Sequence, residues 1–178
     1  MKSKFLTIAI LIMAFTFSSF AQTDKEIDAI VKDIKAKYAD VNKNVKKATM
    51  KNWVVEEEYE GGEKYISEDA DYYYFNNIMI KMHYGAGGGD YSSESEFYYD
   101  NGKLFFFFEK SDITLTDQKE IRCYFKDGKM IKYIYNEINN GKKKPQKDIK
   151  MNSKDFKNQQ VEVLNKEKEL LDSQNKAK

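Results

Sequence analysis

Histidine and cysteine, which often supply catalytic bases and nucleophiles, each occur once in this chain of 178 residues. A Ser–His–Asp or Cys–His arrangement would have to use His83, but the segment Ile80-Lys81-Met82-His83-Tyr84 contains no nucleophile motif. Cys123 lies in an apolar segment, which is typical of a small buried hydrophobe, and the alternative is a thiol that pairs two chains. We therefore expect no catalytic residue of these types, and we expect His83 to be a half-exposed strand residue.

The single histidine and single cysteine also limit the metal sites that the chain can form. A structural zinc site needs several histidine or cysteine ligands, so the sequence predicts no such site and no cofactor. Calcium needs only oxygen ligands in a flexible arrangement. The acidic residues that come closest to such a set are Asp69, Asp71, Asp90, Glu94 and Glu96. They match no EF-hand pattern, and solvated loop acids are the simpler interpretation.

Paired carboxylates of the glycosidase type are a further alternative, because the chain contains 29 aspartates and glutamates. The densest acidic cluster is Glu56-Glu57-Glu58. Consecutive residues of a strand point to opposite faces, so these three cannot act together. A charged edge strand that discourages aggregation explains them better.

A threefold repeat indicates the elements that carry the aromatic residues. Each copy contains two aromatics, any residue, Asn or Asp, Gly or Asn, any residue, and Met or Leu. The copies span 73–79, 98–104 and 124–130. Asn-Gly and Asp-Gly favour two-residue type I′ turns, and Asn76-Asn77 can form the same turn because asparagine tolerates positive φ. The repeat predicts three consecutive hairpins, and Gly61-Gly62 marks an earlier one.

Pairing outward from these turns with period two assigns residues to the two faces of the sheet. One face is the more apolar, with Lys81 and Lys132 near its margins, and its apolar members include Phe97, Leu104, Phe106, Phe108, Phe125 and Ile134. Met82, Phe107 and Tyr133 fall on the opposite face. We expect both helices of the chain to cover the more apolar face.

The opposite face carries the candidate binding residues. Tyrosines offer flat apolar area with a polar tip, and arginine can anchor an anionic group. The candidate ligand-binding residues are Tyr73, Tyr98, Tyr124, Tyr133 and Arg122. The alternative is that these rings form a second half of the core, covered by segment 139–152 or by curvature of the sheet.

Helical patterns flank the strands. A capping box from Thr23 to Glu26 begins a helix over about 24–47, and Ser153 begins a second over about 153–172. The strands occupy about 53–138. The predicted fold is α+β: an N-terminal helix, an antiparallel β-meander of about six to eight strands, and a C-terminal helix. A closed barrel is the alternative.

The N-terminus predicts export. Lys2 and Lys4 precede the apolar run 5–17, and small residues follow at Ser19 and Ala21, as in a cleaved signal peptide. The run is shorter than the roughly 20 residues of a bilayer span. We expect a signal peptide over 1–21, a single domain over 22–178 without a membrane span, and a periplasmic or extracellular location.

Charge argues against nucleic acid as a partner. Cleavage would remove two of the 30 basic residues and none of the 29 acidic ones. The mature domain is therefore close to neutral, and it lacks the excess of basic residues that phosphate binding needs.

The hairpins resemble those of uncharacterised exported bacterial β-meander proteins, with the pattern aromatic-aromatic-x-Asn/Asp-Gly-Lys-Leu/Met. More faintly, they are similar to MORN-variant repeats, in which Tyr-Tyr-x-Asn-Gly-Lys-Leu recurs. The similarity covers about 71–138, and the spacing of 25 and 26 residues is longer than in MORN arrays. Neither resemblance implies a catalytic set at these positions.

Together these patterns favour a non-enzymatic, exported binding or accessory module that uses an aromatic sheet face. Its partner would be a small molecule, a glycan, a peptide or an envelope protein. One alternative is a carboxylate-dependent hydrolase of envelope or external polymers. Another is an envelope structural protein that oligomerises.

Overall fold

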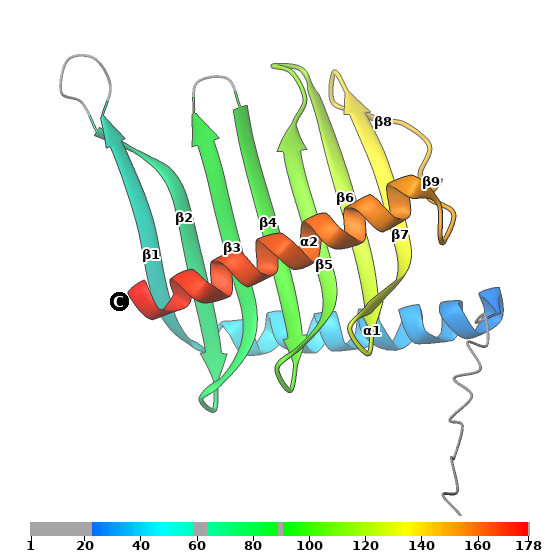
Figure 1. Cartoon of the computed structure of the whole chain (residues 1–178), viewed down its shortest axis with the longest axis horizontal. Helices are drawn as coiled ribbons and strands as arrows, with labels where there is room; N and C mark the ends of the chain where they lie inside the picture. The colour runs from blue at the N-terminus through cyan, green and yellow to red at the C-terminus, as the bar shows by residue number, and fades with distance from the viewer. Residues whose placement is uncertain (1–22, 59–63, 89–90, 178) are drawn as a thin grey trace, which may run out of the picture.

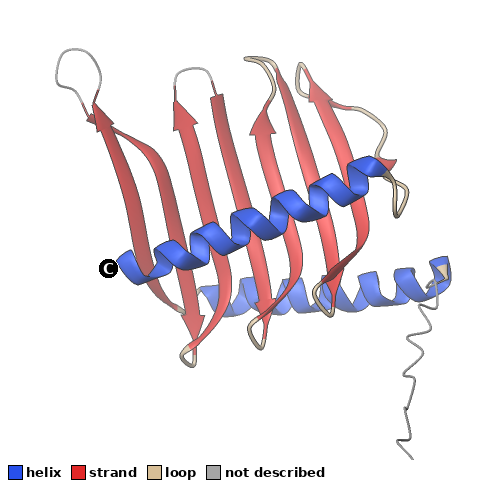
Figure 2. Ribbon diagram, in the orientation of Figure 1, coloured by secondary structure: helices blue, strands red, loops and turns tan. Residues whose placement is uncertain are grey.

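The computed structural model describes residues 23–58, 64–88 and 91–177. The predicted signal peptide, the Gly61-Gly62 turn and Asp90 lie outside these residues. Within the described chain, two α-helices flank one antiparallel sheet (Figures 1 and 2). None of the described helices is long and apolar enough to cross a membrane.

The helices are α1 (Asp24–Val45) and α2 (Lys154–Ser173), and a 3-10 turn, η1 (Gln174–Lys176), follows α2. The strands are β1 (Thr49–Glu58), β2 (Lys64–Phe75), β3 (Ile78–Gly88), β4 (Tyr91–Asp100), β5 (Lys103–Asp112), β6 (Asp117–Lys126), β7 (Lys129–Asn139), β8 (Lys142–Lys143) and β9 (Lys147–Asp148). Strands β1 to β8 follow chain order across the sheet, and β9 also pairs with β7. The predicted α+β meander is confirmed, and the described sheet is open rather than a closed barrel.

Both helices begin at the predicted caps. The Glu26 backbone N–H donates to Thr23 Oγ1 at 3.3 Å, and the Thr23 N–H donates to Glu26 Oε2 at 2.8 Å. At α2, the Phe156 N–H donates to Ser153 Oγ at 3.2 Å. Each cap satisfies backbone donors that have no partner within the helix.

The three repeat hairpins turn as their dipeptides predict. Residues Asn101 and Gly102 have φ of 50° and 74°, and the equivalent residues of the other two hairpins are also in the left-handed region. Two such residues in succession are the signature of a type I′ turn, whose twist matches that of the paired strands.

Each repeat hairpin also contains a bulge on its second strand. In the first, Tyr73 pairs with Lys81 while Tyr74 pairs with Met79, so Ile80 has no partner. The equivalent unpaired residues of the second and third hairpins are Phe105 and Ile131. One extra residue reverses the face to which all later residues of that strand point.

The bulges correct the predicted faces. Residues beyond them join the face that carries Phe97: these are Met82, Phe107 and Tyr133. The residues that move to the opposite face include Phe106 and Ile134, which pack with the α1 helix. Lys81 and Lys132, which stand opposite Tyr73 and Tyr124 in the pairing, move with them.

The two helices therefore cover opposite faces, and the prediction that both pack on the Phe97–Leu104–Phe125 face is wrong. Helix α2 crosses the near side of the sheet in Figure 1, and α1 crosses the far side near the hairpin turns. Buried α2 residues such as Val163 pack with Phe97, whereas buried α1 residues such as Ile34 pack with Tyr98. Because both faces of the sheet carry apolar side chains, each face needs a helix to remove its apolar surface from water.

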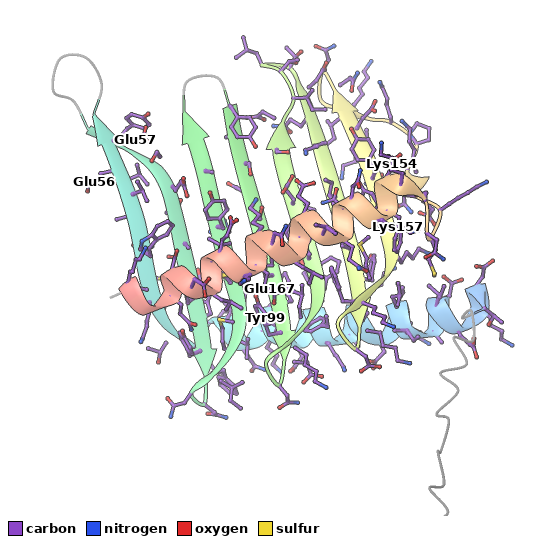
Figure 3. The ribbon with its side chains drawn as sticks, viewed as in Figure 1. Glu56, Glu57, Tyr99, Lys154, Lys157 and Glu167 are labelled. Carbon is purple, nitrogen blue, oxygen red and sulfur yellow. The ribbon has the colours of Figure 1, made fainter. Side chains whose placement is uncertain are left out.

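Tyrosine hydroxyls fix α2 to the sheet. Tyr72 is fully buried, and its hydroxyl donates to the Leu170 carbonyl oxygen at 2.7 Å. Gln174 Nε2 donates to the Tyr74 hydroxyl. The buried Tyr99 lies beside Glu167 of α2 (Figure 3). All three rings supply core volume, and the hydroxyls of Tyr72 and Tyr74 anchor the end of α2 and the start of η1.

The edge of the sheet matches the expectation for the acidic cluster. Strand β1 is the first in the sheet order, so it pairs only with β2. Glu56 and Glu57 lie on this edge strand (Figure 3).

The single cysteine, Cys123, is fully buried in the α2-side core, as the sequence predicts.

Candidate ligand-binding groove

The sheet register places three of the predicted tyrosines in one row. On the α1 side, successive cross-strand partners are Met50, Tyr73, Lys81, Tyr98, Phe106, Tyr124 and Lys132. We call this the tyrosine row. Tyr133 is not part of it, because it packs in the α2-side core on the opposite face.

Helix α1 covers the middle of the tyrosine row. Tyr98 is fully buried, Tyr124 is 4% exposed, and the Tyr38 ring lies 4.9 Å from the Tyr98 ring between centroids. The Tyr98 hydroxyl donates to Glu96 Oε2 at 2.7 Å. Burial, followed by this bond to Glu96, raises the pKa of Tyr98 well above its ordinary value. Tyr98 and Tyr124 are therefore core residues.

Tyr73 lies outside the part of the row that α1 buries. It is half-buried, and its hydroxyl donates to Asp71 Oδ2 at 3.3 Å. Burial first, and then the charge of Asp71, raise the pKa of Tyr73. Its polar tip is thus directed to the acidic residues of β2 rather than to Arg122.

A second row of cross-strand partners lies on the same face, two residues further along each strand from the repeat-hairpin turns. Its members, in strand order, are Asn52, Asp71, His83, Glu96, Phe108, Arg122 and Ile134. We call it the polar row. All its members except Ile134 are half-buried. Polar and charged groups therefore line the sheet next to the helix.

A groove lies between α1 and these two rows. Its first part is a cavity of about 280 Å³ lined by Ile34, Lys35, Tyr38, Glu96, Phe106, Phe108, Arg122 and Tyr124. An adjoining cavity of about 460 Å³ shares Lys35, Arg122 and Tyr124 with it and adds Asp28, Val31, Lys32, Lys132, Ile134 and Gln146. We call these two cavities together the α1 groove. Aromatic rings form much of its floor.

Arg122 is held firmly at the centre of the groove. Its Nη2 donates to Glu120 Oε2 at 2.9 Å, and its guanidinium lies 5.5 Å from the centre of the Phe108 ring. Asn136, with its amide oriented to satisfy both polar atoms, accepts from Arg122 Nη1 at 2.8 Å. A guanidinium fixed in this way is preorganised for a ligand.

The carboxylate behind Arg122 is ionised. Burial raises the pKa of Glu120, but hydrogen bonds from Lys143 at 3.0 Å and the charges of Lys143 and Arg122 lower it overall. Glu96 is likewise compensated, because Lys81 Nζ lies 2.6 Å from its Oε1. Glu96 and Glu120 therefore each carry a basic partner.

Two lysines of α1 have no such partner. Lys32 and Lys35 are exposed, and neither forms an ion pair with a residue of the described chain. Lys132, by contrast, is paired with Asp28 at 3.3 Å and Asp148 at 3.5 Å. The α1 groove thus combines an aromatic floor with uncompensated positive charge along its helical wall.

The sequence located only part of this groove. It identified Arg122 and Tyr124, but it placed Phe106 and Phe108 on the opposite face because the bulge was not included. A signal was present: the unbroken apolar run from Leu104 to Phe108 cannot alternate between core and solvent. Lys32 and Lys35 could not be found, because charged positions on a helix do not reveal which side lies next to a sheet.

Protein-family models, curated proteins and solved structures were compared with this chain, and none of them matches it.

Proposed function

We propose that this protein is a non-enzymatic binding module, exported and freed of residues 1–21, whose α1 groove holds an anionic amphipathic ligand. The apolar part of the ligand lies on Phe106 and Phe108, and its anionic group contacts Lys35, Lys32 and Arg122. One observation carries the proposal: two lysines without ion-pair partners lie along an aromatic groove that already contains a fixed guanidinium.

The size and chemistry of the groove support a small ligand. Its two cavities, of about 280 and 460 Å³, are of the order of the roughly 300–1,000 Å³ typical of small-molecule sites. Such sites are mostly apolar with a few fixed polar groups. Rings of Phe and Tyr supply the apolar area, and the cations select the charge of the ligand.

The groove gives less support to the hydrolase alternative. A glycosidase-type centre needs two carboxyls roughly 5–10 Å apart, one of them free to act as an acid or a base. Two carboxylates of the described residues line the groove. Glu96 already binds Lys81 and Tyr98, and Asp28 pairs with Lys132 at 3.3 Å. This arrangement favours binding over hydrolysis.

A fluorescence titration with 8-anilinonaphthalene-1-sulfonate tests the proposal, because this dye is anionic, amphipathic and aromatic. We expect saturable binding to the purified protein that weakens as salt screens the lysines. Lys35→Glu should weaken binding about tenfold or more, equivalent to ~1.4 kcal/mol. Lys47→Glu is the matched control, because Lys47 is exposed and lies beyond the last turn of α1.

The two variants make the result decisive. Equal dye affinity for Lys35→Glu, Lys47→Glu and the wild type would place the dye elsewhere and overturn the groove as the site. The proposed class, anionic amphipathic ligands, would be overturned if the dye shows no saturable binding and aliphatic and aromatic carboxylates and sulfates show none either. Circular dichroism melts of each variant show whether the fold is retained.

A further inference from the structure

Three potential metal ligands meet on the α1 side of the sheet, beside the groove but not among the residues that line it. They are Asp69 and Asp71 of β2 and His83 of β3. One ligand atom from each residue lies within 4.8 Å of the other two. All three side chains are half-buried, so water or a further ligand can reach them. Asp71 and His83 are direct cross-strand partners, and this register fixes the cluster.

Gly85 makes room for the third ligand. Asp69 is the cross-strand partner of Gly85, and a Cβ added at Gly85 would lie 2.4 Å from Asp69 Oδ1. The Asp69 carboxylate therefore leans across β3 over a position with no side chain. A Cβ at position 85 would force Asp69 Oδ1 to move, because real Cβ atoms do not approach an oxygen so closely.

Charge in the cluster is uncompensated. Asp69, Asp71 and Glu94, the last paired across the sheet with Gly85, form no ion pair with any other described residue. Lys81, in the neighbouring tyrosine row, does not neutralise this charge, because its Nζ pairs with Glu96 Oε1 at 2.6 Å. A bound cation would supply the missing positive charge.

One ligand is oriented by outer contacts of the kind found around metal sites. Asn52 Nδ2 donates to Asp71 Oδ1 at 2.7 Å, and the Tyr73 hydroxyl donates to Asp71 Oδ2 at 3.3 Å. Such second contacts fix the direction of a ligating carboxylate. Asp69 receives no hydrogen bond from the described residues, so its oxygens are free to coordinate.

We propose that Asp69, Asp71 and His83 bind a divalent first-row transition-metal ion, with Zn²⁺ as its test metal. The mixed set of two carboxylates and one imidazole suits these ions better than calcium, which takes oxygen ligands almost entirely. Three protein ligands leave a coordination position open, unlike the closed four-ligand sites of structural zinc. Such an open site differs from the structural zinc site that the sequence predicts to be absent.

Isothermal titration of Zn²⁺ into protein purified without a histidine tag tests this site. We expect one ion per chain, and a chemical-shift change of the single imidazole in a ¹⁵N-edited spectrum. His83→Gln and Asp71→Asn should each weaken binding about tenfold or more. Asp172→Asn, an exposed acid near the end of α2, should bind as the wild type does.

Gly85→Ala is the sharpest variant, because it removes no ligand. It should weaken Zn²⁺ binding at least as much as His83→Gln, whereas Gly88→Ala should have no effect. A Cβ at Gly88 meets its nearest neighbour, the Tyr65 ring, at an ordinary 4.0 Å. If Gly85→Ala does not fold, the half-exposed His83→Gln still decides the result.

Three outcomes would overturn the site. The first is the absence of Zn²⁺ binding by the wild type. The second is binding that His83→Gln and Asp71→Asn leave unchanged, which would identify scattered surface carboxylates. The third is Ca²⁺ binding at these residues without Zn²⁺ binding. None of these outcomes depends on the dye titration of the α1 groove, so the two proposals fail or survive separately.

Discussion

His83 on β3 and Glu96 on β4 are direct cross-strand partners in the polar row. His83 belongs to the three-residue metal cluster, and Glu96 lines the α1 groove. The two proposed sites are therefore neighbours on one face of the sheet, although no side chain belongs to both. A charge placed at one site changes the electrostatic potential at the other.

This proximity predicts coupling between the two ligands. A divalent ion about 12 Å from an anionic group, two to three strand spacings away, attracts it by about 0.7 kcal/mol in water. Saturating Zn²⁺ should therefore raise dye affinity about threefold at low salt, and the dye should raise Zn²⁺ affinity equally. The effect should disappear in His83→Gln. Unchanged dye affinity in the presence of bound Zn²⁺ would show that the two sites are uncoupled.

Tyr98 should behave as a core residue rather than as a ligand contact. Tyr98→Ala removes a fully buried ring from beneath α1 and should cost about 3–5 kcal/mol of unfolding free energy. Tyr98→Phe keeps the ring and loses the hydroxyl contacts to Glu96 at 2.7 Å and to Asn42 at 3.3 Å, so it should cost about 1–2 kcal/mol. Urea denaturation measures both. Tyr91→Ala, at a tyrosine that is 53% exposed, should stay within about 0.5 kcal/mol of the wild type.

A Tyr98→Ala protein as stable as the wild type would contradict the packing of α1 on this row. Tyr98→Ala is for the same reason unsuitable as a test of ligand binding, because it would also destabilise the fold. Lys35→Glu is the better test, because Lys35 is exposed and lines the groove.

Local signals predicted most of the fold because they act over a few residues. The turn at Asn101-Gly102 needs two residues that tolerate positive φ, and the capping box at Thr23 and Glu26 needs only its own four residues. These signals gave the order of helices and strands. They could be recognised without knowledge of anything distant in the chain.

The faces and the site depend on relations that the local pattern does not contain. Because Phe105 is unpaired, Phe106 lies on the α1 side of the sheet and Phe107 on the α2 side. Simple alternation from the turn assigns each of them to the other side. The bulges therefore leave apolar residues on both faces, and one helix covers each face. The meeting of Asp69 and His83 depends on the register of β2 with β3, which is set by the bulge at Ile80.

Glycine at position 77 should stabilise the turn of the first repeat hairpin. Asn77 has φ of 63°, whereas the equivalent Gly102 has φ of 74°, and glycine adopts this region without the steric cost of a Cβ. Asn77→Gly should stabilise the protein by about 0.5–1 kcal/mol, and Gly102→Asn should destabilise it by a similar amount. Thermal melts of the two variants and of the double variant measure this. A loss of stability in Asn77→Gly would mean that the Asn77 side chain makes a stabilising contact.

The pair formed by Tyr99 and Glu167 predicts how stability varies with pH. The Tyr99 hydroxyl is buried and forms no well-formed hydrogen bond to a described residue, and Glu167 lies beside it (Figure 3). Burial raises the pKa of Glu167 above its ordinary value of 4.5, and the Tyr99 hydroxyl offsets this only in part. The folded protein thus holds the Glu167 proton more tightly than the unfolded chain does.

A raised folded-state pKa costs stability as pH rises. Below the ordinary pKa, both states are protonated and Glu167 makes no pH-dependent contribution. Between the ordinary and the raised pKa, the unfolded chain loses its proton first, so the free energy of unfolding falls. Above the raised pKa the full cost is present. Glu167→Gln cannot ionise, so it should be more stable than the wild type by about 1 kcal/mol near pH 8.

The difference between Glu167→Gln and the wild type should shrink towards zero near pH 4, where both side chains are neutral. Glu169→Gln, two residues further along α2 and exposed, should follow the wild type at both pH values. Urea denaturation at each pH gives the unfolding free energies. If Glu167→Gln were less stable than the wild type near pH 8, the ionised carboxylate would have to be stabilised by Tyr99 more than burial disfavours it. The hydroxyl of Tyr99 would then be a hydrogen-bond donor that locks α2 to the sheet.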